Sequence, residues 1–269
     1  MAGRRVASLI LAGMALSACS SGQPTSPGLT ASISSASGPS PTASFDTATV
    51  GQVTLYICGT CEEAADRLGL DLHSDVVDVT RHIDAQLSLP TAYVDIADNP
   101  KGAIPGVGVG GVSLGTRVSI FLDPQFPNFR QTVFLWLPRT LAHELDETKR
   151  RDALAEGSRL RDHLVTDGIA DTFSVQTFPQ GPPNPWDEAL TPEQERQAWT
   201  MARPHLDDVL DDHGFAHWFF GGGAIPHWAG YTIGFHVIAS YLALHPGITA
   251  VDLTTMDARK ILAGSGYRP

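Results

Sequence analysis

The pattern of hydrophobic and polar positions divides the 269-residue chain into three stretches. A short apolar run occupies 6–16, and the stretch 20–44 consists almost entirely of Ser, Thr, Pro, Ala and Gly. From about residue 51 onward, apolar residues recur at helix and strand spacings to the end of the chain. Because repeated apolar faces build a core, we expect one folded domain over 51–269, long enough for a sizeable core.

Alternating apolar positions predict β-strands in the first part of this domain. Strands are expected at 53–57, 91–96 and 117–122. Helices are expected at 62–68 and 75–87, the second with its apolar residues on one face. These elements predict a small mixed sheet.

Helical periodicity replaces this alternation in the second part. A helix with one apolar stripe is expected around 137–149, a second over 158–178 and a third over 226–245. The predicted fold class is therefore α+β, with a small N-terminal mixed sheet and a mainly helical C-terminal half.

A glycine-rich segment, 104–115, lies between two predicted strands and fits two motifs. One is the dinucleotide-binding fingerprint, and the other, at 111–115, is the nucleophile elbow of serine hydrolases with Ser113 as nucleophile. Both motifs require a helix next, whereas 118–122 has the pattern of a strand. We interpret the glycines as a strand or loop that another backbone approaches closely, for instance an extended peptide adding to a sheet edge.

The first nineteen residues have the pattern of a lipoprotein signal peptide. Arg4 and Arg5 precede the apolar run, and Leu16-Ser-Ala-Cys19 is a small-residue processing site that ends in cysteine. The run is too short to span a bilayer. We therefore expect a signal peptide over 1–18 and a lipid on Cys19 that anchors the protein at the extracytoplasmic face of the cell membrane. The alternative is a plain secretory signal with Cys19 at that position by accident.

Composition characterises the stretch after Cys19 and excludes one class of partner. The stretch 19–50 has too few large apolar residues to bury a core, so we expect a disordered Ser/Thr/Pro tether behind the lipidated cysteine. The net charge of the chain is −11, and removal of the signal peptide would make it more negative, because Arg4 and Arg5 would be lost. Nucleic acid is therefore a poor partner.

Cys58 and Cys61 are the only other cysteines. Outside the cytoplasm, a Cys-x-x-Cys pair favours a local disulfide over a zinc knuckle, which needs two more ligands. A thioredoxin-like redox pair is the remaining alternative, although no βαβ pattern with the usual companions of such a pair comes after it.

The segment around His143 suggests metal chemistry. His143 and Glu144 lie on a predicted helix, and a second ligand at position 147 would share the face of His143, because residues at i and i+4 lie on one side of a helix. Position 147 holds Glu, which is a less usual zinc ligand than His. On the next long helix His163 and Asp167 also stand at i and i+4. Gly168 beside them predicts close packing of another helix.

Several blocks together resemble a known family of predicted zinc-dependent proteases, catalogued as a domain of unknown function. The resemblance covers nearly all of the domain, and its most specific blocks are His143-Glu144 and 228–234. The remaining blocks are Ile104-Pro through Gly110-Gly111, Ile120-Phe-Leu-Asp123, Thr140-Leu-Ala, Asp167-Gly-Ile-Ala170, Trp218-Phe-Phe-Gly221 and Pro226-His.

This resemblance implies a zincin-like fold and a zinc site whose ligand positions hold His143, Glu147 and Asp167. Two of these three ligands are altered from the family pattern, while Glu144, the implied general base, is retained. We add His163 as a hypothesis, because an imidazole one turn before Asp167 would replace the one missing at position 147; the alternative is a surface histidine. Tyr231 is a candidate oxyanion donor, or else a packed tyrosine with a satisfied hydroxyl.

The sequence supports three functional hypotheses. The first is a membrane-anchored extracytoplasmic zinc metallopeptidase that hydrolyses peptide bonds with metal-activated water. The second is a catalytically inactive zincin-fold lipoprotein that acts as a binding or envelope module, which the altered ligands favour. The third, more remote, is a serine hydrolase that uses Ser113.

Overall fold

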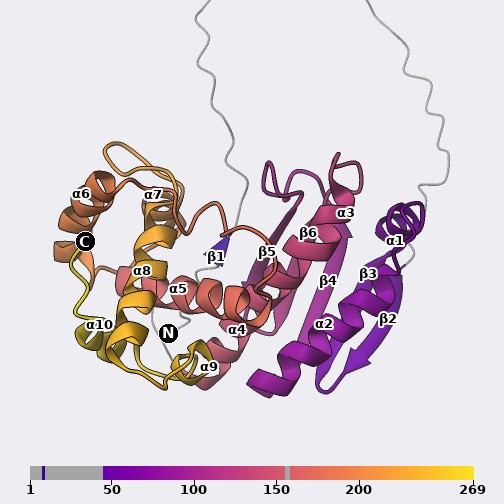
Figure 1. Ribbon diagram of the computed structural model, residues 1–269, viewed down its shortest axis with the longest axis horizontal. Helices are drawn as coiled ribbons and strands as arrows, with labels where there is room; N and C mark the ends of the chain where they lie inside the picture. Colours follow the sequence, from indigo (N-terminus) through magenta and orange to yellow (C-terminus); the bar gives the residue numbers. More distant parts are fainter. Residues whose placement is uncertain (1–7, 10–44, 155–157) are drawn as a thin grey trace, which may run out of the picture.

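A mixed β-sheet occupies one side of the molecule, and the helices of the C-terminal half occupy the other (Figure 1). The computed structural model describes residues 8–9, 45–154 and 158–269. Most of the expected signal peptide, Cys19 and the tether up to residue 44 lie outside the described residues. The α+β class and the helical C-terminal half are confirmed, while the zincin-like arrangement remains a prediction.

Across the described part of the chain, six strands lie in the order β1-β5-β6-β4-β3-β2. Strands β3, β4 and β6 run parallel, and β2 and β5 pair antiparallel with β3 and β6. The two-residue β1 pairs antiparallel with β5, with Ser8 opposite Ser113. The strands are β1 (Ser8–Leu9), β2 (Phe45–Val50), β3 (Val53–Cys58), β4 (Ala92–Asp98), β5 (Val109–Leu114) and β6 (Arg117–Leu122).

An edge strand lies before residue 51, where the folded domain was expected to begin. Strand β2 begins at Phe45 and pairs along its whole length with β3. Its residues are mostly exposed, as its place at the sheet edge requires, so their polar composition resembled that of a tether.

The helices have the expected order. α1 and α2 connect β3 to β4, and all helices from α3 onward come after the sheet. A π-helical turn, η1, leads directly into α4. The helical segments are α1 (Gly59–Asp66), α2 (Leu72–Leu87), α3 (Phe129–Gln131), η1 (Thr132–Trp136), α4 (Leu137–Ala153), α5 (Leu160–Thr177), α6 (Pro192–Ala202), η2 (Arg203–His205), α7 (Asp212–Phe219), α8 (Ala229–Leu244), α9 (Ala250–Leu253) and α10 (Ala258–Ser265).

The core of the sheet is apolar because alternate side chains of each central strand point inward. In register across three strands lie Ile57, Ile96 and Ile120, each fully buried. Each such side chain contributes about 1.5–3 kcal/mol when buried. This interior needs no polar partner.

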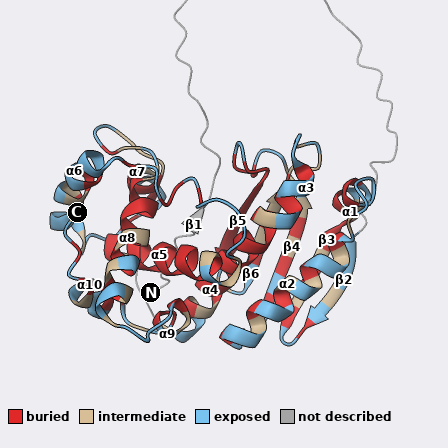
Figure 2. Ribbon diagram, in the orientation of Figure 1, coloured by how far each residue is buried: buried red, intermediate tan, exposed pale blue. Residues whose placement is uncertain are grey.

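Helices α4 and α5 are buried on almost every side and form the centre of the molecule (Figure 2). α5 contacts both α4 and α8. Its contact with α8 depends on two glycines, because a Cβ added to Gly168 would lie 2.3 Å from the carbonyl oxygen of Gly234. The close helix contact expected beside Asp167 is present.

A disulfide joins Cys58, the last residue of β3, to Cys61 in α1. Within the described residues, no helix has both the length and the apolar character needed to cross a bilayer.

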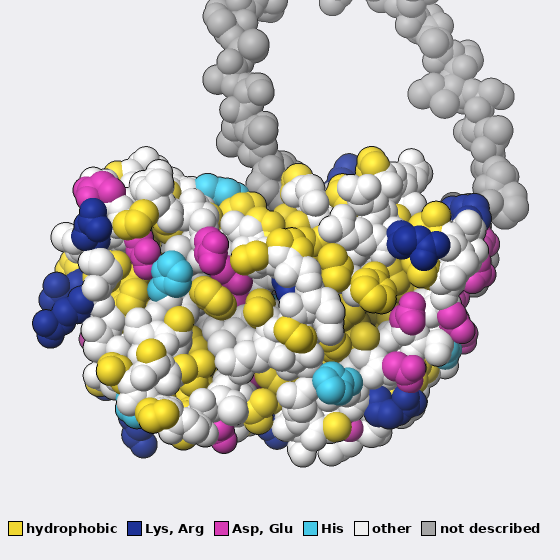
Figure 3. All heavy atoms as spheres, in the orientation of Figure 1, with side chains coloured by type: hydrophobic (Ala, Val, Ile, Leu, Met, Phe, Trp, Pro, Cys, Tyr) yellow, Lys and Arg dark blue, Asp and Glu magenta, His cyan; other side chains and the backbone are white. Residues whose placement is uncertain are grey.

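On the face shown in Figure 3, hydrophobic side chains gather across the middle, and Lys and Arg side chains lie towards its periphery.

Candidate metal centre

Helices α4 and α5 bring three of the predicted ligands together in the buried centre of the molecule. His143 Nε2 lies 3.7 Å from Glu147 Oε1 and 3.9 Å from Asp167 Oδ1. One ligand atom of each residue lies within 4.8 Å of the others, and all three side chains are buried. The i, i+4 spacing of His143 and Glu147 on α4 produces the first of these contacts.

The free carboxylate oxygens of this cluster have no hydrogen-bond partner among the described residues. Glu147 Oε1 and both carboxylate oxygens of Asp167 are buried and accept no hydrogen bond from the described residues. A buried carboxylate without a partner costs several kcal/mol, and a divalent cation would satisfy all three oxygens at once. The residues therefore fit a divalent cation, with one imidazole nitrogen and two carboxylates as donors.

The imidazole of His143 is held in one orientation by Asp171 on α5. His143 Nδ1 lies 2.9 Å from Asp171 Oδ1, which also accepts a hydrogen bond of 3.0 Å from Trp186 Nε1. Burial alone would lower the pKa of His143, but attraction and hydrogen bonding to Asp171 outweigh it and raise the pKa well above the usual value. With Nδ1 directed at Asp171, Nε2 faces the two carboxylates, as in metal sites where a carboxylate orients a ligating histidine.

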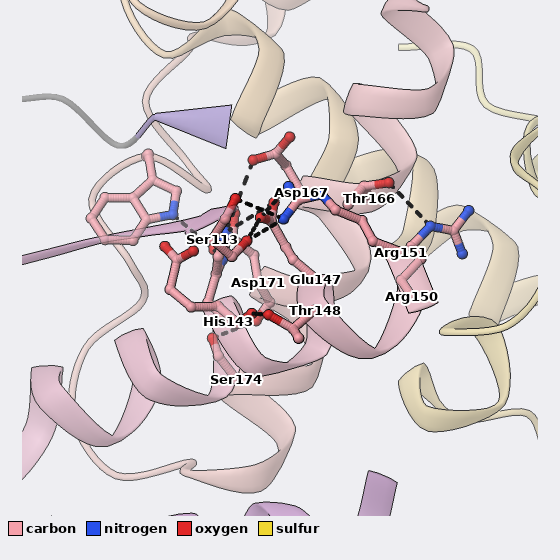
Figure 4. Close-up of polar contacts among 12 residues, drawn as sticks. Ser113, His143, Glu147, Thr148, Arg150, Arg151, Thr166, Asp167, Asp171 and Ser174 are labelled. Atoms are coloured by element: carbon pink, nitrogen blue, oxygen red, sulfur yellow. Dashed lines mark hydrogen bonds and ion pairs between the residues drawn. The ribbon is translucent and has the colours of Figure 1, made fainter. Parts of the chain in front are cut away.

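Glu147 is held by its second oxygen. Glu147 Oε2 accepts hydrogen bonds of 2.6 Å from Ser113 Oγ and of 2.6 Å from Arg151 Nη2. Figure 4 shows Ser113, Glu147 and Arg151 directed toward one another. Burial would raise the pKa of Glu147, but Arg151, His143 and these hydrogen bonds lower it. Burial and the charge of Glu147 raise the pKa of Asp167 well above its usual range.

Glu144 lies against the glycine-rich strand. A Cβ at Gly111 of β5 would be 2.6 Å from Glu144 Oε1, so only glycine leaves room for this side chain. Both oxygens of Glu144 are buried without a hydrogen-bond partner among the described residues, and burial followed by repulsion from Glu147 raises its pKa to about 8. Gly111 therefore accommodates a side chain from α4. The close approach of another backbone that the sequence suggested is present at the neighbouring Gly110, where a Cβ would lie 2.2 Å from the carbonyl oxygen of Gly102.

The nucleophile-elbow hypothesis for Ser113 has no support. Strand β6, and no helix, comes after the glycine-rich strand, and the Ser113 hydroxyl donates to Glu147. No histidine accepts a hydrogen bond from it among the described contacts.

His163 does not belong to the three-residue cluster. Its ring packs edge-on against Phe215 and Phe219, with centroids 5.1 Å and 6.2 Å away. Burial lowers its pKa to about 4, and its Nε2 has no hydrogen-bond partner among the described residues. It is not the surface residue of the alternative interpretation either.

The Tyr231 hydroxyl is buried and accepts or donates no hydrogen bond within the described residues. Burial raises the pKa of this hydroxyl well above the usual value, and the negative charges of Asp167 and Asp171 raise it further. The hydroxyl therefore keeps its proton. The tyrosine is packed, as one interpretation of the sequence has it, but its hydroxyl has no hydrogen-bond partner among the described residues.

Asp171, Arg151 and Asp187 are site residues that the sequence did not single out. Asp171 comes one helical turn after Asp167 within a buried helix, and Arg151 comes after Glu147 at the same spacing, so both had a detectable signal. Asp187 had none. It lies in the loop after α5, and burial together with Asp171 raises its pKa to about 9.

Comparison with known proteins places the chain in a family. A family model described as Predicted Zn-dependent protease (DUF2268) matches residues 94–263, which contain every residue of the cluster. The chain belongs to this family.

Two relatives of the DUF2268 chain are uncharacterized proteins of Bacillus subtilis (strain 168). YjfC is 24% identical over 181 residues, which cover 61% of this chain and 54% of YjfC. YjaZ is 27% identical over 139 residues, which cover 47% of this chain and 53% of YjaZ. The chain thus spans about half the length of the curated relatives it matches.

Proposed function

We propose that this member of the family is a metal-dependent peptidase that uses Glu144 as its general base. The observation that carries the proposal is the convergence of His143, Glu147 and Asp167 in the buried centre, where the carboxylate oxygens Glu147 Oε1, Asp167 Oδ1 and Asp167 Oδ2 have no hydrogen-bond partner among the described residues. The family description supports zinc as the metal and a protease as the activity. The fold supports Glu144 as the base, because Gly111 leaves room for the Glu144 side chain beside the cluster.

A bound divalent cation supplies Lewis-acid polarisation of a carbonyl oxygen and lowers the pKa of a water molecule toward neutrality. His143, Glu147 and Asp167 would hold this cation, and Asp171 keeps the His143 ring in place. Glu144 takes the proton of the attacking water and passes it to the nitrogen of the leaving amine. Tyr231, protonated and unpartnered, donates a hydrogen bond to the oxygen on which negative charge develops.

A peptide substrate suits the edge of the sheet next to Glu144. Strand β5 has β6 on one side, and the two-residue β1 pairs antiparallel with its other side. Residues 8–9 belong to the segment that signal processing would remove, which would leave this side of β5 open to an extended peptide. Strand addition gives main-chain hydrogen bonds without a sequence requirement.

The proposed location rests on the N-terminal sequence. The lipobox that ends at Cys19 supports an anchor in the cell membrane, with the catalytic domain on the extracytoplasmic face. The disulfide between Cys58 and Cys61 is consistent with an oxidising compartment.

The experiment uses the processed full chain, purified in detergent, with metal content and hydrolysis of an unfolded protein both measured. We expect about one divalent metal per chain and hydrolysis that a chelator abolishes. Glu144→Gln should keep the metal and lower the hydrolysis rate at least about 100-fold, because the proton acceptor is lost. Glu63→Gln, an exposed change on α1, is the matched control.

A second candidate function is an inactive metal-binding or ligand-binding module. Glu147 favours it, since a carboxylate stands where the implied site has an imidazole, which is a more usual zinc ligand. A metal-loaded wild-type protein that hydrolyses nothing, with Glu144→Gln indistinguishable from it, would establish this second function and refute the first. Hydrolysis that resists chelators but is stopped by a serine-directed phosphonate would refute both.

A further inference from the structure

We infer that Ser113 and Arg151 clamp Glu147 as a one-oxygen metal ligand, and that a carboxylate in place of an imidazole at this position lowers the ratio of zinc affinity to the affinity for harder divalent cations such as Mn²⁺. The inference rests on the metal centre of the proposed function and names the cation class of that centre. In this inference Ser113, which the sequence offered as a candidate nucleophile, positions a metal ligand.

The clamp joins the edge strand to the metal helix through one oxygen atom. Ser113 Oγ and Arg151 Nη2 both donate to Glu147 Oε2, each at 2.6 Å. Arg151 Nη1 donates to the Ser113 carbonyl oxygen at 3.0 Å and also to its hydroxyl. One guanidinium therefore bridges the serine of β5 and the glutamate of α4.

This arrangement determines how Glu147 meets a cation. Oε2 of Glu147 already accepts two hydrogen bonds, so only Oε1 is free to bind a cation. This oxygen lies 3.7 Å from His143 Nε2. The Arg151 side chain is 27% exposed and Glu147 is fully buried, so the guanidinium contacts the carboxylate from the solvent side of the cluster. The planar fork of arginine fixes the carboxylate more firmly than a lysine ammonium would.

The donor set then favours one class of cation over another. Imidazole suits zinc, whereas carboxylate oxygens suit Mg²⁺, Ca²⁺ and Mn²⁺. In this centre one imidazole nitrogen, from His143, meets oxygens of Glu147 and Asp167, and the expected source of a second nitrogen, His163, packs against phenylalanines. Zinc remains the tighter binder in absolute terms under the Irving–Williams order, but the ratio between zinc and manganese affinities is reduced.

The ratio is measured by calorimetric titration of the metal-stripped full chain with ZnCl₂ and with MnCl₂. Glu147→His should raise the ratio of zinc to manganese affinity at least tenfold relative to wild type, which corresponds to about 1.4 kcal/mol. We use the ratio of the two affinities because Glu147→His also leaves Arg151 without its carboxylate partner. Any general loss of binding from that change lowers both affinities and does not alter their ratio. If Glu147→His fails to fold, Asp167→His, which leaves the clamp intact, should raise the ratio in the same direction. A ratio that does not change in either folded variant overturns the inference about the cation class.

The clamp is tested with the charge held constant. Arg151→Lys keeps the positive charge but loses the fork, and Ser113→Ala removes the neutral donor. Each should weaken binding of both cations about threefold to tenfold without changing their ratio, and Arg151→Lys should have no such effect in the Glu147→His background. Arg117→Lys, at an exposed ion pair with Asp95, is the matched control.

Unchanged affinities in Arg151→Lys and Ser113→Ala would show that Glu147 needs no positioning and would overturn the clamp. A wild-type chain that binds the cations with the expected ratio but hydrolyses nothing refutes the proposed peptidase and leaves this inference standing. A chain that binds neither cation refutes both.

Discussion

The interior of the sheet and the interface between α4 and α5 are equally buried, but they bury opposite kinds of side chain. Across β3, β4 and β6 the buried positions are aliphatic, and each adds to stability without needing a partner. Between α4 and α5 the buried positions include four carboxylates close together, with Arg151 in direct contact with one of them. Those four carboxylates are Glu144, Glu147, Asp167 and Asp171.

This difference separates the parts of the molecule that hold the fold from the parts that serve its chemistry. Unpartnered buried carboxylates lower stability, so stability alone does not explain why the chain has them. A site that must bind a dication and accept a proton does explain them, because the same charges become favourable when the cation is present. Substitutions in the two regions should therefore change stability with opposite signs.

The largest effect is expected in the sheet. Leu55→Ala, in the centre of β3, removes a fully buried side chain and should lower the free energy of unfolding by about 3 kcal/mol. The metal affinity of the folded molecules should not change, because Leu55 lies outside the cluster. Urea unfolding of the metal-free chain measures the first quantity and calorimetric titration the second. Leu244→Ala, at an exposed position of α8, is the control, with a change below about 0.5 kcal/mol.

A change at the contact between α5 and α8 should combine loss of stability with loss of the site. Gly168→Ala places a Cβ 2.3 Å from the Gly234 carbonyl oxygen, so a backbone must move, at a cost of about 3 kcal/mol. The movement would displace the neighbouring Asp167 and weaken metal binding as well. Gly214→Ala in α7 is the matched control, because its Cβ meets only side chains at 3.3 Å or more. Equal effects of the two substitutions on unfolding would contradict the close-contact argument.

The opposite sign is expected inside the cluster. The pKa of Asp167 is raised well above its usual 3.8, so ionisation of this residue destabilises the metal-free fold at any pH above 3.8, increasingly up to the folded pKa. Asp167→Asn should therefore stabilise the metal-free chain by about 2 kcal/mol at neutral pH, and by less at pH 5. It should also abolish the rise in melting temperature that a saturating cation produces.

Calorimetric scans with and without metal test both statements. Asp66→Asn, an exposed change on α1, is the control and should alter neither stability nor the response to metal. A metal-free Asp167→Asn chain that melts below the wild type would reverse the contrast between the two regions.

The same contrast explains how much the sequence predicts. Periodicity is a local signal, and it located β3, β4, β6, α2 and α5 within a few residues. It also placed His143 and Glu147 on one face of α4, because a helix fixes that relation by itself. The edge strand β2 was missed because it is exposed and has no apolar alternation.

The features that the sequence did not predict depend on contacts between distant segments. His163, Asp167 and Asp171 stand at four-residue steps on α5, yet Asp171, and not His163, contacts His143. His163 instead packs against phenylalanines of α7. Ser113 and Arg151 lie 38 residues apart, and only the packing of β5 on α4 reveals their shared partner.

The smallest predicted effect concerns an ion pair outside both regions. His236 Nδ1 on α8 lies 2.6 Å from Glu195 Oε1 on α6, and Tyr267 also donates to that carboxylate. The hydrogen bond to Glu195 raises the pKa of His236 above 6.5, whereas the pKa of Glu195 is lowered from 4.5 because hydrogen bonds from His236 and Tyr267 outweigh burial. The His236 contribution to stability is therefore complete below pH 6.5 and is lost as the pH rises through its folded pKa, while that of Glu195 is lost as the pH falls below 4.5.

His236→Gln should thus lower the free energy of unfolding by up to about 1 kcal/mol near pH 5.5 and by less at pH 9, since the pair is partly exposed. Urea unfolding at the two pH values measures the difference, with His213→Gln, at an exposed position of α7, as the control. An equal loss at both pH values would mean that His236 contributes through packing and not through its charge. A larger loss at pH 9 than at pH 5.5 would contradict the sign of the linkage, because a neutral imidazole has no ion pair with Glu195 to lose.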